Sequence, residues 1–158
     1  MSIQVGDKIP NVKLMIMGDK GPQPVSSLEL FNNKKVVLFS VPGAFTPTCS
    51  NAHLPGFVVK ADDIKAKGVD SIICMSVNDV FVMHAWGQSQ NAENITMLAD
   101  GNGDFSDALG LTMDGRGFQM GTRSKRFAMI VNDGSVELIN VDETGFEKSS
   151  AESILEAL

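Results

Sequence analysis

The sequence predicts an α/β fold in which a central mixed β-sheet is flanked by helices. Two patterns lead to this expectation. Short apolar segments alternate with helix-like segments along most of the chain, and a β-hairpin pattern followed by a last helix ends it. The length of 158 residues is typical of one domain, and no linker or repeat interrupts it. We therefore expect a single domain over residues 1–158.

The clearest strand pattern is the apolar, β-branched run at residues 36–41, which suits a central strand buried on both faces. The run ends at Pro42 and Gly43. Residues 46–67 follow with hydroxyl side chains and a proline near their start, which predicts a helix. Pro55 is expected to kink the first part of this helix, because proline lacks a backbone N–H and clashes with the preceding turn.

The later segments continue the alternation of strands and helices. They are, in order, a strand at 69–77, a helix at 79–90, a strand at 95–99, a helix at 105–109, a hairpin of 127–131 with 136–141, and a helix at 150–158. An Asp-Gly step between the hairpin strands supplies residues that tolerate positive φ. This order of elements is typical of a thioredoxin-like fold.

Two regions show little regular pattern. Before residue 33 only residues 12–17 indicate a strand, and the glycines and prolines at 18–24 predict turns. Residues 112–125 contain three glycines and no clear period, so we expect a surface loop there.

The composition excludes several classes of function. A net charge of −6 argues against nucleic-acid binding, which draws on clustered Lys and Arg. The longest apolar run is far too short to span a membrane, and the N-terminal residues lack a secretory pattern, so we expect a cytoplasmic protein. Two cysteines, Cys49 and Cys74, are too few for a disulfide scaffold, a four-cysteine zinc site or an iron–sulfur cage. We expect neither a metal site nor a bound cofactor.

Cys49 lies at the predicted strand-to-helix turn, a position that favours chemistry. Unpaired N–H groups and the helix dipole at a helix start favour a thiolate, the nucleophilic form of cysteine. The carboxyl end of a central strand is also where α/β folds bind ligands. The alternative is a buried structural cysteine.

The residues around Cys49 resemble the peroxiredoxin motif Pro-x-x-x-Thr-x-x-Cys, formed here by Pro42, Thr46 and Cys49. The longer runs 41–50 and 53–57 are similar to the type II, peroxiredoxin-5-like branch, which includes atypical two-cysteine and glutaredoxin-dependent members. Further similar segments are 74–79, 86–87, 98–100 and 125–127. The resemblance implies a thioredoxin-like fold and an antioxidant thiol peroxidase. It would reduce hydrogen peroxide and alkyl hydroperoxides through a sulfenic acid on the peroxidatic Cys49.

The resemblance also implies roles for the residues around the thiol. Arg126, the Thr46 hydroxyl and the backbone N–H groups of Thr48 and Cys49 would stabilise the transition state, and Pro42 would shield the thiolate from water. The implied substrate-binding residues are Gly43, Phe45 and Thr48. The family usually forms homodimers, with Phe45 near the contact.

The residues themselves suggest plainer roles for some of these side chains. Without the motif, Arg126 would be a solvated arginine in a basic patch with Arg123 and Lys125. Phe45 and Trp86 are expected to be packing residues. His53 is expected to have a surface or packing role, or else to face the rim of the site and modulate the thiolate.

Cys74 can be interpreted either as a small apolar core residue or as the resolving cysteine. Some type II members place a resolving cysteine in the C-terminal segment, but residues 145–149 contain none here. We therefore expect an external thiol to recycle Cys49. The resemblance makes glutathione with glutaredoxin the first choice and thioredoxin the second.

The sequence also bears on three other functions. A redox-sensing binding module, in which oxidation of Cys49 switches a partner interaction, is the main alternative to the peroxidase. A thiol–disulfide oxidoreductase is disfavoured because the sequence has no Cys-x-x-Cys. Residues 100–104 match the opening of a calcium loop, but Phe105 and Leu111 occupy the positions of the required glycine and glutamate.

Overall fold

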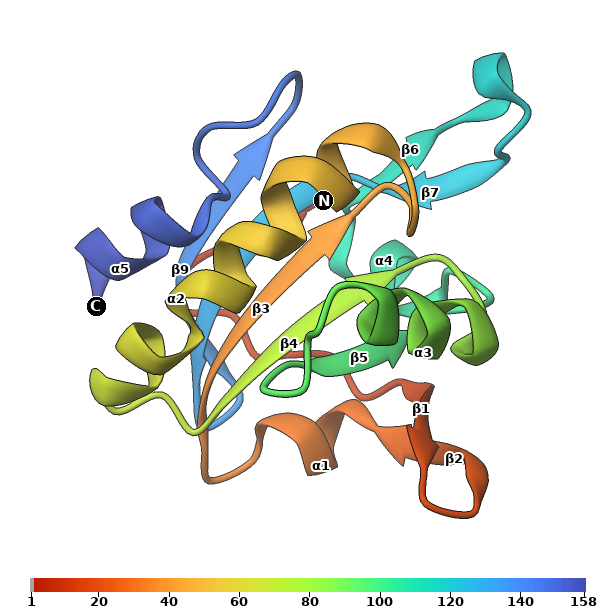
Figure 1. Cartoon of the computed structure of the whole chain (residues 1–158). Helices are drawn as coiled ribbons and strands as arrows, with labels where there is room; N and C mark the ends of the chain where they lie inside the picture. The colour runs from red at the N-terminus through yellow and green to blue at the C-terminus, as the bar shows by residue number, and fades with distance from the viewer. Residues whose placement is uncertain (1) are drawn as a thin grey trace.

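The computed structural model describes residues 2–158. They form a seven-stranded mixed sheet of order β2-β1-β5-β4-β3-β8-β9 with helices packed against it, and a separate two-stranded sheet, β6-β7 (Figure 1). The main-sheet strands are β1 (Lys13–Gly18), β2 (Gly21–Ser26), β3 (Lys35–Val41), β4 (Ser71–Ser76), β5 (Thr96–Ala99), β8 (Arg126–Asn132) and β9 (Ser135–Asp142). The helices are α1 (Ser27–Phe31), α2 (Leu54–Ala66), α3 (Val80–Ser89), α4 (Asp104–Leu109) and α5 (Ala151–Ala157). The predicted mixed α/β architecture is confirmed.

β3 occupies the middle of the fold, as its sequence predicted. It pairs parallel to β4 and antiparallel to β8. Val37 and Phe39 enter a core shared with α2, α3 and α5, whereas Val36 and Leu38 enter a second core shared with α1 and α4. Because successive side chains of a strand point to opposite faces, a strand between two cores is mostly apolar on both. The buried Ser40 is the exception, and its hydroxyl is hydrogen-bonded to the Met75 carbonyl and to Ser124.

The N-terminal region is more regular than its sequence suggested. Strand β2 lies where most of the turns at 18–24 were expected, and it pairs only with β1 at the edge of the sheet. An edge strand accepts Pro22 and Pro24 because it needs hydrogen bonds on one side only. Helix α1 was missed as well. Ser26 and Glu29 form a capping box at its start, with each side chain accepting from the other residue's backbone N–H.

The expected loop at 112–125 also contains regular structure. β6 (Thr112–Asp114) and β7 (Thr122–Ser124) pair antiparallel, and a short 3₁₀ helix, Arg116–Phe118, forms the tip between them. Strands of three residues are too short to leave a periodic pattern in a sequence, which explains the wrong prediction.

The helix that carries Cys49 is irregular where Pro55 predicted a distortion. Residues 47–48 are α-helical, Cys49–His53 form a π-helical turn, and α2 continues from Leu54. The Leu54 N–H donates to the Cys49 carbonyl, one residue farther back than in an α-helix. π turns are rare and occur often at functional sites. Among residues 2–158 no helix is long and apolar enough to cross a membrane.

Candidate active site

The loop between β3 and the Cys49 helix is held in place by the end of β4. The Ala44 N–H donates to Asn78 Oδ1 at 3.0 Å, and the Ser76 hydroxyl donates to the same oxygen. The Thr46 hydroxyl donates to the Gly43 carbonyl at 2.6 Å. The N–H groups of Thr48 and Cys49 lie in the first helical turn, where no backbone carbonyl of the helix can accept from them, and the Thr46 hydroxyl does not cap them.

Cys49 is fully buried in the first turn of the helix, against the guanidinium of Arg126. Arg126 Nη2 donates to Cys49 Sγ at 3.1 Å. A guanidinium can only donate, so this contact is strongest when the sulfur is an anion. Arg126 is the first residue of β8 and is only 9% exposed. The alternative of a solvated arginine is therefore wrong, because β8 carries the side chain into the core.

His53 lies on the other side of the same guanidinium. Arg126 Nη1 donates to His53 Nδ1 at 2.9 Å, and His53 Nε2 lies 2.9 Å from the Ser149 carbonyl oxygen. Because arginine cannot accept, Nδ1 must be the acceptor and Nε2 must carry the proton donated to Ser149. Burial, followed by the charge of Arg126, lowers the pKa of His53 to about 3. The imidazole is therefore neutral at physiological pH.

Of the roles expected for His53, a surface position is wrong, whereas packing in the core is confirmed and the contact with Arg126 adds a link to Cys49. The His53 ring is fully buried and packs against Phe39, Phe57 and Phe146. Its position one helical turn after Cys49 was the only available signal, and that spacing did not show that both residues share Arg126.

Cys74 is a core residue of β4, where it pairs with Phe39 of β3 and Met97 of β5. Both cysteines are buried free thiols and belong to the same apolar core. Burial, together with the nearby Cys49, raises the pKa of the Cys74 thiol well above its ordinary value. Cys74 is therefore a neutral thiol in the resting protein.

The remaining predicted residues lie in the loop before Cys49 or next to it. Pro42 is half-buried at its start, Gly43 is buried, and Thr48 is exposed. Phe45, expected to be a packing residue, is 56% exposed, and its ring lies 6.4 Å from that of Trp86. Trp86 is fully buried as expected, and its Nε1 donates to the Ser50 hydroxyl beside Cys49.

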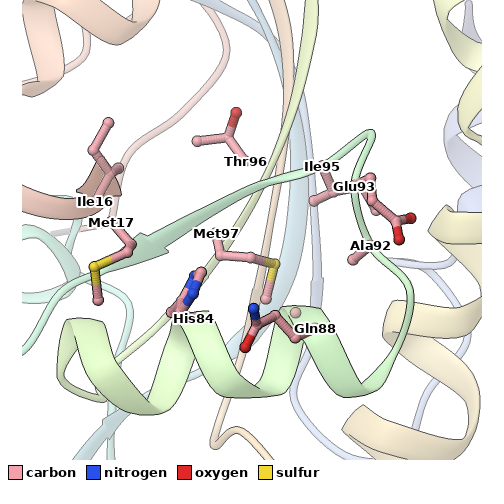
Figure 2. Close-up of a pocket in the computed structure, with 10 residues that line it drawn as sticks. Ile16, Met17, His84, Gln88, Ala92, Glu93, Ile95, Thr96 and Met97 are labelled. Atoms are coloured by element: carbon pink, nitrogen blue, oxygen red, sulfur yellow. The ribbon is translucent and has the colours of Figure 1, made fainter. Parts of the chain in front are cut away.

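Away from Cys49 the structure has a separate pocket and a hydrogen-bonded aspartate at residue 100. A pocket of about 550 Å³ lies between β1, α3 and β5, where His84, Gln88 and Met97 line it without any residue of the Cys49 loop (Figure 2). Asp100, at the start of the apparent calcium loop, instead accepts from the N–H groups of Phe105 and Ser106 at the start of α4. Within residues 2–158, no three His, Cys, Asp or Glu side chains gather as a metal site would require.

The fold is thioredoxin-like, and the site places a buried cysteine in contact with an arginine at a helix start, an arrangement typical of thiol enzymes. A family model described as Redoxin matches residues 4–155. Peroxiredoxin-2D of Arabidopsis thaliana is 46% identical over 159 residues, covering 99% of this chain and 98% of that protein. The chloroplastic Peroxiredoxin-2E of the same plant is 47% identical over 165 residues, covering 99% of this chain and 70% of that protein.

A solved structure of reduced Prx3 from Vibrio vulnificus, in complex with H2O2, matches with a TM-score of 0.96. It is 56% identical, and the match covers 98% of each chain. The chain therefore belongs to the redoxin family and is a type II-like peroxiredoxin, a peroxidase. The resemblance seen in the sequence is confirmed at the level of the family.

Proposed function

We propose that this peroxiredoxin reduces hydrogen peroxide and alkyl hydroperoxides through Cys49. The observation that carries the proposal is the buried contact between Arg126 Nη2 and Cys49 Sγ at 3.1 Å. The thiolate attacks one peroxide oxygen and the O–O bond breaks. Cys49 then becomes a sulfenic acid, and the departing oxygen takes up a proton and leaves as water or an alcohol.

The groups around Cys49 suit the charge that develops in this reaction. Negative charge moves from sulfur to the peroxide oxygens, where Arg126 and the free N–H groups of Thr48 and Cys49 can stabilise it. The Thr46 hydroxyl gives its own proton to Gly43, so its oxygen can accept from the peroxide O–H. Pro42, Gly43 and Phe45 would shield the thiolate and shape the entrance. The cycle uses neither a metal nor a bound cofactor.

An external thiol, with glutathione and glutaredoxin as first choice and thioredoxin as second, is the proposed reductant. The thiol attacks the sulfenic sulfur, water leaves, and a second thiol then releases Cys49 from the mixed disulfide. Two observations support this route over Cys74. The pKa of the Cys74 thiol is raised by burial, and the C-terminal segment that approaches Arg126 through Phe146 contains no cysteine.

Stopped-flow peroxide reduction by the wild type and Cys49→Ser tests the first half of the cycle. We expect a fast reaction that disappears in Cys49→Ser, whereas a rate constant no higher than that of a free thiolate would favour the redox-sensing alternative.

Cys74→Ser tests the second half of the cycle, the reduction of oxidised Cys49. It should keep turnover with glutathione and glutaredoxin, and loss of that turnover with an intact single-turnover reaction would make Cys74 the resolving residue.

We further propose a cytoplasmic homodimer. Two free thiols suit a reducing compartment. Phe45 and Phe81 are large exposed aromatic residues, one beside α3 and one on it, and such side chains favour a protein interface. Sedimentation of the wild type and of Phe81→Ser should show a dimer that the substitution weakens, and fractionation of cells tests the compartment.

A further inference from the structure

Asp142 is a buried carboxylate outside the residues that the motif assigns. It ends β9 directly opposite Arg126 of β8 and is 7% exposed. Four donors from one short segment reach its two oxygens. They are the N–H groups of Glu147, Lys148 and Ser149, at 3.1, 2.9 and 2.9 Å, and the Ser149 hydroxyl at 2.6 Å.

These contacts fix the backbone of residues 147–149. Burial raises the pKa of Asp142, but the hydrogen bonds from Ser149, Lys148 and Glu147 outweigh burial and leave the pKa below its ordinary value. The group is therefore an anion that accepts every one of these bonds. Because all of its donors belong to adjacent residues, the carboxylate organises the segment rather than joining distant parts of the chain.

The ordered segment is the support of His53. The Ser149 carbonyl accepts the proton of His53 Nε2, and Phe146 of the same segment packs on the imidazole at 4.9 Å between ring centroids. With Nε2 protonated, Nδ1 is free to accept from Arg126 Nη1, while Nη2 of the same guanidinium reaches Cys49. An unbroken series of hydrogen bonds thus joins Asp142 to the sulfur.

We propose that Asp142 is a positioning residue for the peroxide reaction. By fixing the Ser149 carbonyl, it selects the His53 tautomer that accepts from Arg126, and so holds the guanidinium on Cys49. In the other tautomer an N–H of His53 would face an N–H of Arg126, and the guanidinium would have to turn away from the sulfur. The inference rests on the proposed function, because it takes Cys49 as the nucleophile.

The test compares Asp142→Asn with the wild type and with a matched control, Asp114→Asn. Asp114 is an exposed aspartate that pairs only with Arg116 on the surface hairpin. Two quantities are measured: the second-order rate constant for hydrogen peroxide, and the His53 tautomer from imidazole ¹⁵N shifts. Trp86, the sole tryptophan, bonds to Ser50 beside Cys49 and serves as a fluorescence probe of the rate.

We expect Asp142→Asn to lower the rate constant by about 10- to 100-fold, the size of effect that slight misplacement of a catalytic group produces. The ¹⁵N shifts of His53 should change to a mixture of tautomers, and Asp114→Asn should leave both quantities unchanged. A folded Asp142→Asn protein with the wild-type rate and the wild-type His53 shifts would overturn the proposal. So would a lower rate with an unchanged tautomer, because the effect would then be a general structural one.

Ser149→Ala provides a milder variant if Asp142→Asn does not fold. It removes one of the four hydrogen bonds to Asp142 and keeps the carbonyl that His53 uses. A smaller decrease in rate with a partial change of tautomer supports the proposal, and no change in either contradicts it. Cys49→Ser distinguishes failure of the proposed function from failure of the Asp142 proposal. If this variant still reduces peroxide, Cys49 is not the nucleophile and the proposed function is wrong.

Discussion

Arg126 donates to His53 and to Cys49 from two different nitrogens of one guanidinium, at 2.9 Å and 3.1 Å. The two bonds fix the plane of the guanidinium, because Nη1 and Nη2 are rigidly linked. His53 thus limits the rotation of the group that would stabilise the reacting sulfur. This geometry explains why a neutral histidine is buried beside an arginine, where a protonated one would be repelled.

Arg126→Lys keeps the positive charge but should slow the enzyme strongly. A lysine ammonium is a point charge that lacks the planar fork, so it cannot hold His53 Nδ1 and Cys49 Sγ in one fixed geometry. We expect the rate constant for hydrogen peroxide to fall by about 100-fold, the usual cost of losing one preorganised donor. Stopped-flow measurement checks this against Arg116→Lys, a surface change that should be neutral. A rate close to the wild type would show that charge alone is sufficient.

The low pKa of His53 predicts a loss of stability in acid. The unfolded chain binds a proton at His53 near pH 6.5, whereas the folded chain does so only near pH 3, so unfolding takes up a proton in this range. The stabilisation is complete above pH 6.5 and disappears as the pH falls toward 3. At about 1.4 kcal/mol per pKa unit, the free energy of unfolding should fall by roughly 3 to 5 kcal/mol on this account.

His53→Gln isolates this contribution. A glutamine can accept from Arg126 and donate to Ser149, but it does not titrate. Urea unfolding between pH 7 and pH 4 should therefore show a shallower decrease for His53→Gln than for the wild type. His84→Gln, at an exposed histidine, is the control and should keep the wild-type slope. Equal slopes for all three proteins would contradict the buried neutral imidazole.

The sequence was sufficient for the parts of the molecule that obey local rules. Residues 36–41 indicated a central strand because the run is apolar on both faces apart from Ser40, and Pro55 indicated the irregular turn after Cys49. By contrast, β2 was hidden by its prolines, since only its position at the sheet edge makes them acceptable. β6 and β7 were hidden by their length of three residues each.

The site shows the same division between local and long-range information. Cys49 was recognisable because a helix start and a motif surround it. The contact of Arg126 with His53 depends on a separation of 73 residues, which no local pattern can indicate. Asp142 was missed for another reason. Its partners are mainly backbone N–H groups, which every sequence provides, so the residue types around it carry no signal.

Thr46→Val should strongly lower the rate constant for peroxide and only slightly lower the free energy of unfolding. The valine keeps the shape of threonine but loses the 2.6 Å bond to the Gly43 carbonyl, at a cost of about 1 kcal/mol. It also removes the oxygen that would accept from the peroxide, so we expect the rate constant to fall by about 100-fold. Thr46→Ser, which retains the hydroxyl, should stay within a few-fold of the wild type. Thr122→Val, at an exposed threonine of β7, is the control and should leave the rate constant unchanged. A larger loss of rate for Thr46→Ser than for Thr46→Val would contradict the role of the Thr46 hydroxyl.

Gly43→Ala should make the enzyme more selective for small peroxides. A Cβ at residue 43 would lie 3.1 Å from Thr46 Cγ2 and 3.2 Å from Met120 Cε, so both side chains must shift by a few tenths of an ångström. Gly43 does not have a positive φ, and the backbone therefore accepts alanine without strain.

We expect kcat/KM of Gly43→Ala to fall about tenfold for a tertiary alkyl hydroperoxide and less for hydrogen peroxide, because displaced side chains obstruct the larger substrate first. Adding Met120→Ala removes one of the two crowding contacts and should recover part of the loss for the alkyl substrate. Equal losses for both substrates, with no recovery in the double variant, would show that residue 43 acts on Cys49 chemistry and not on access to it.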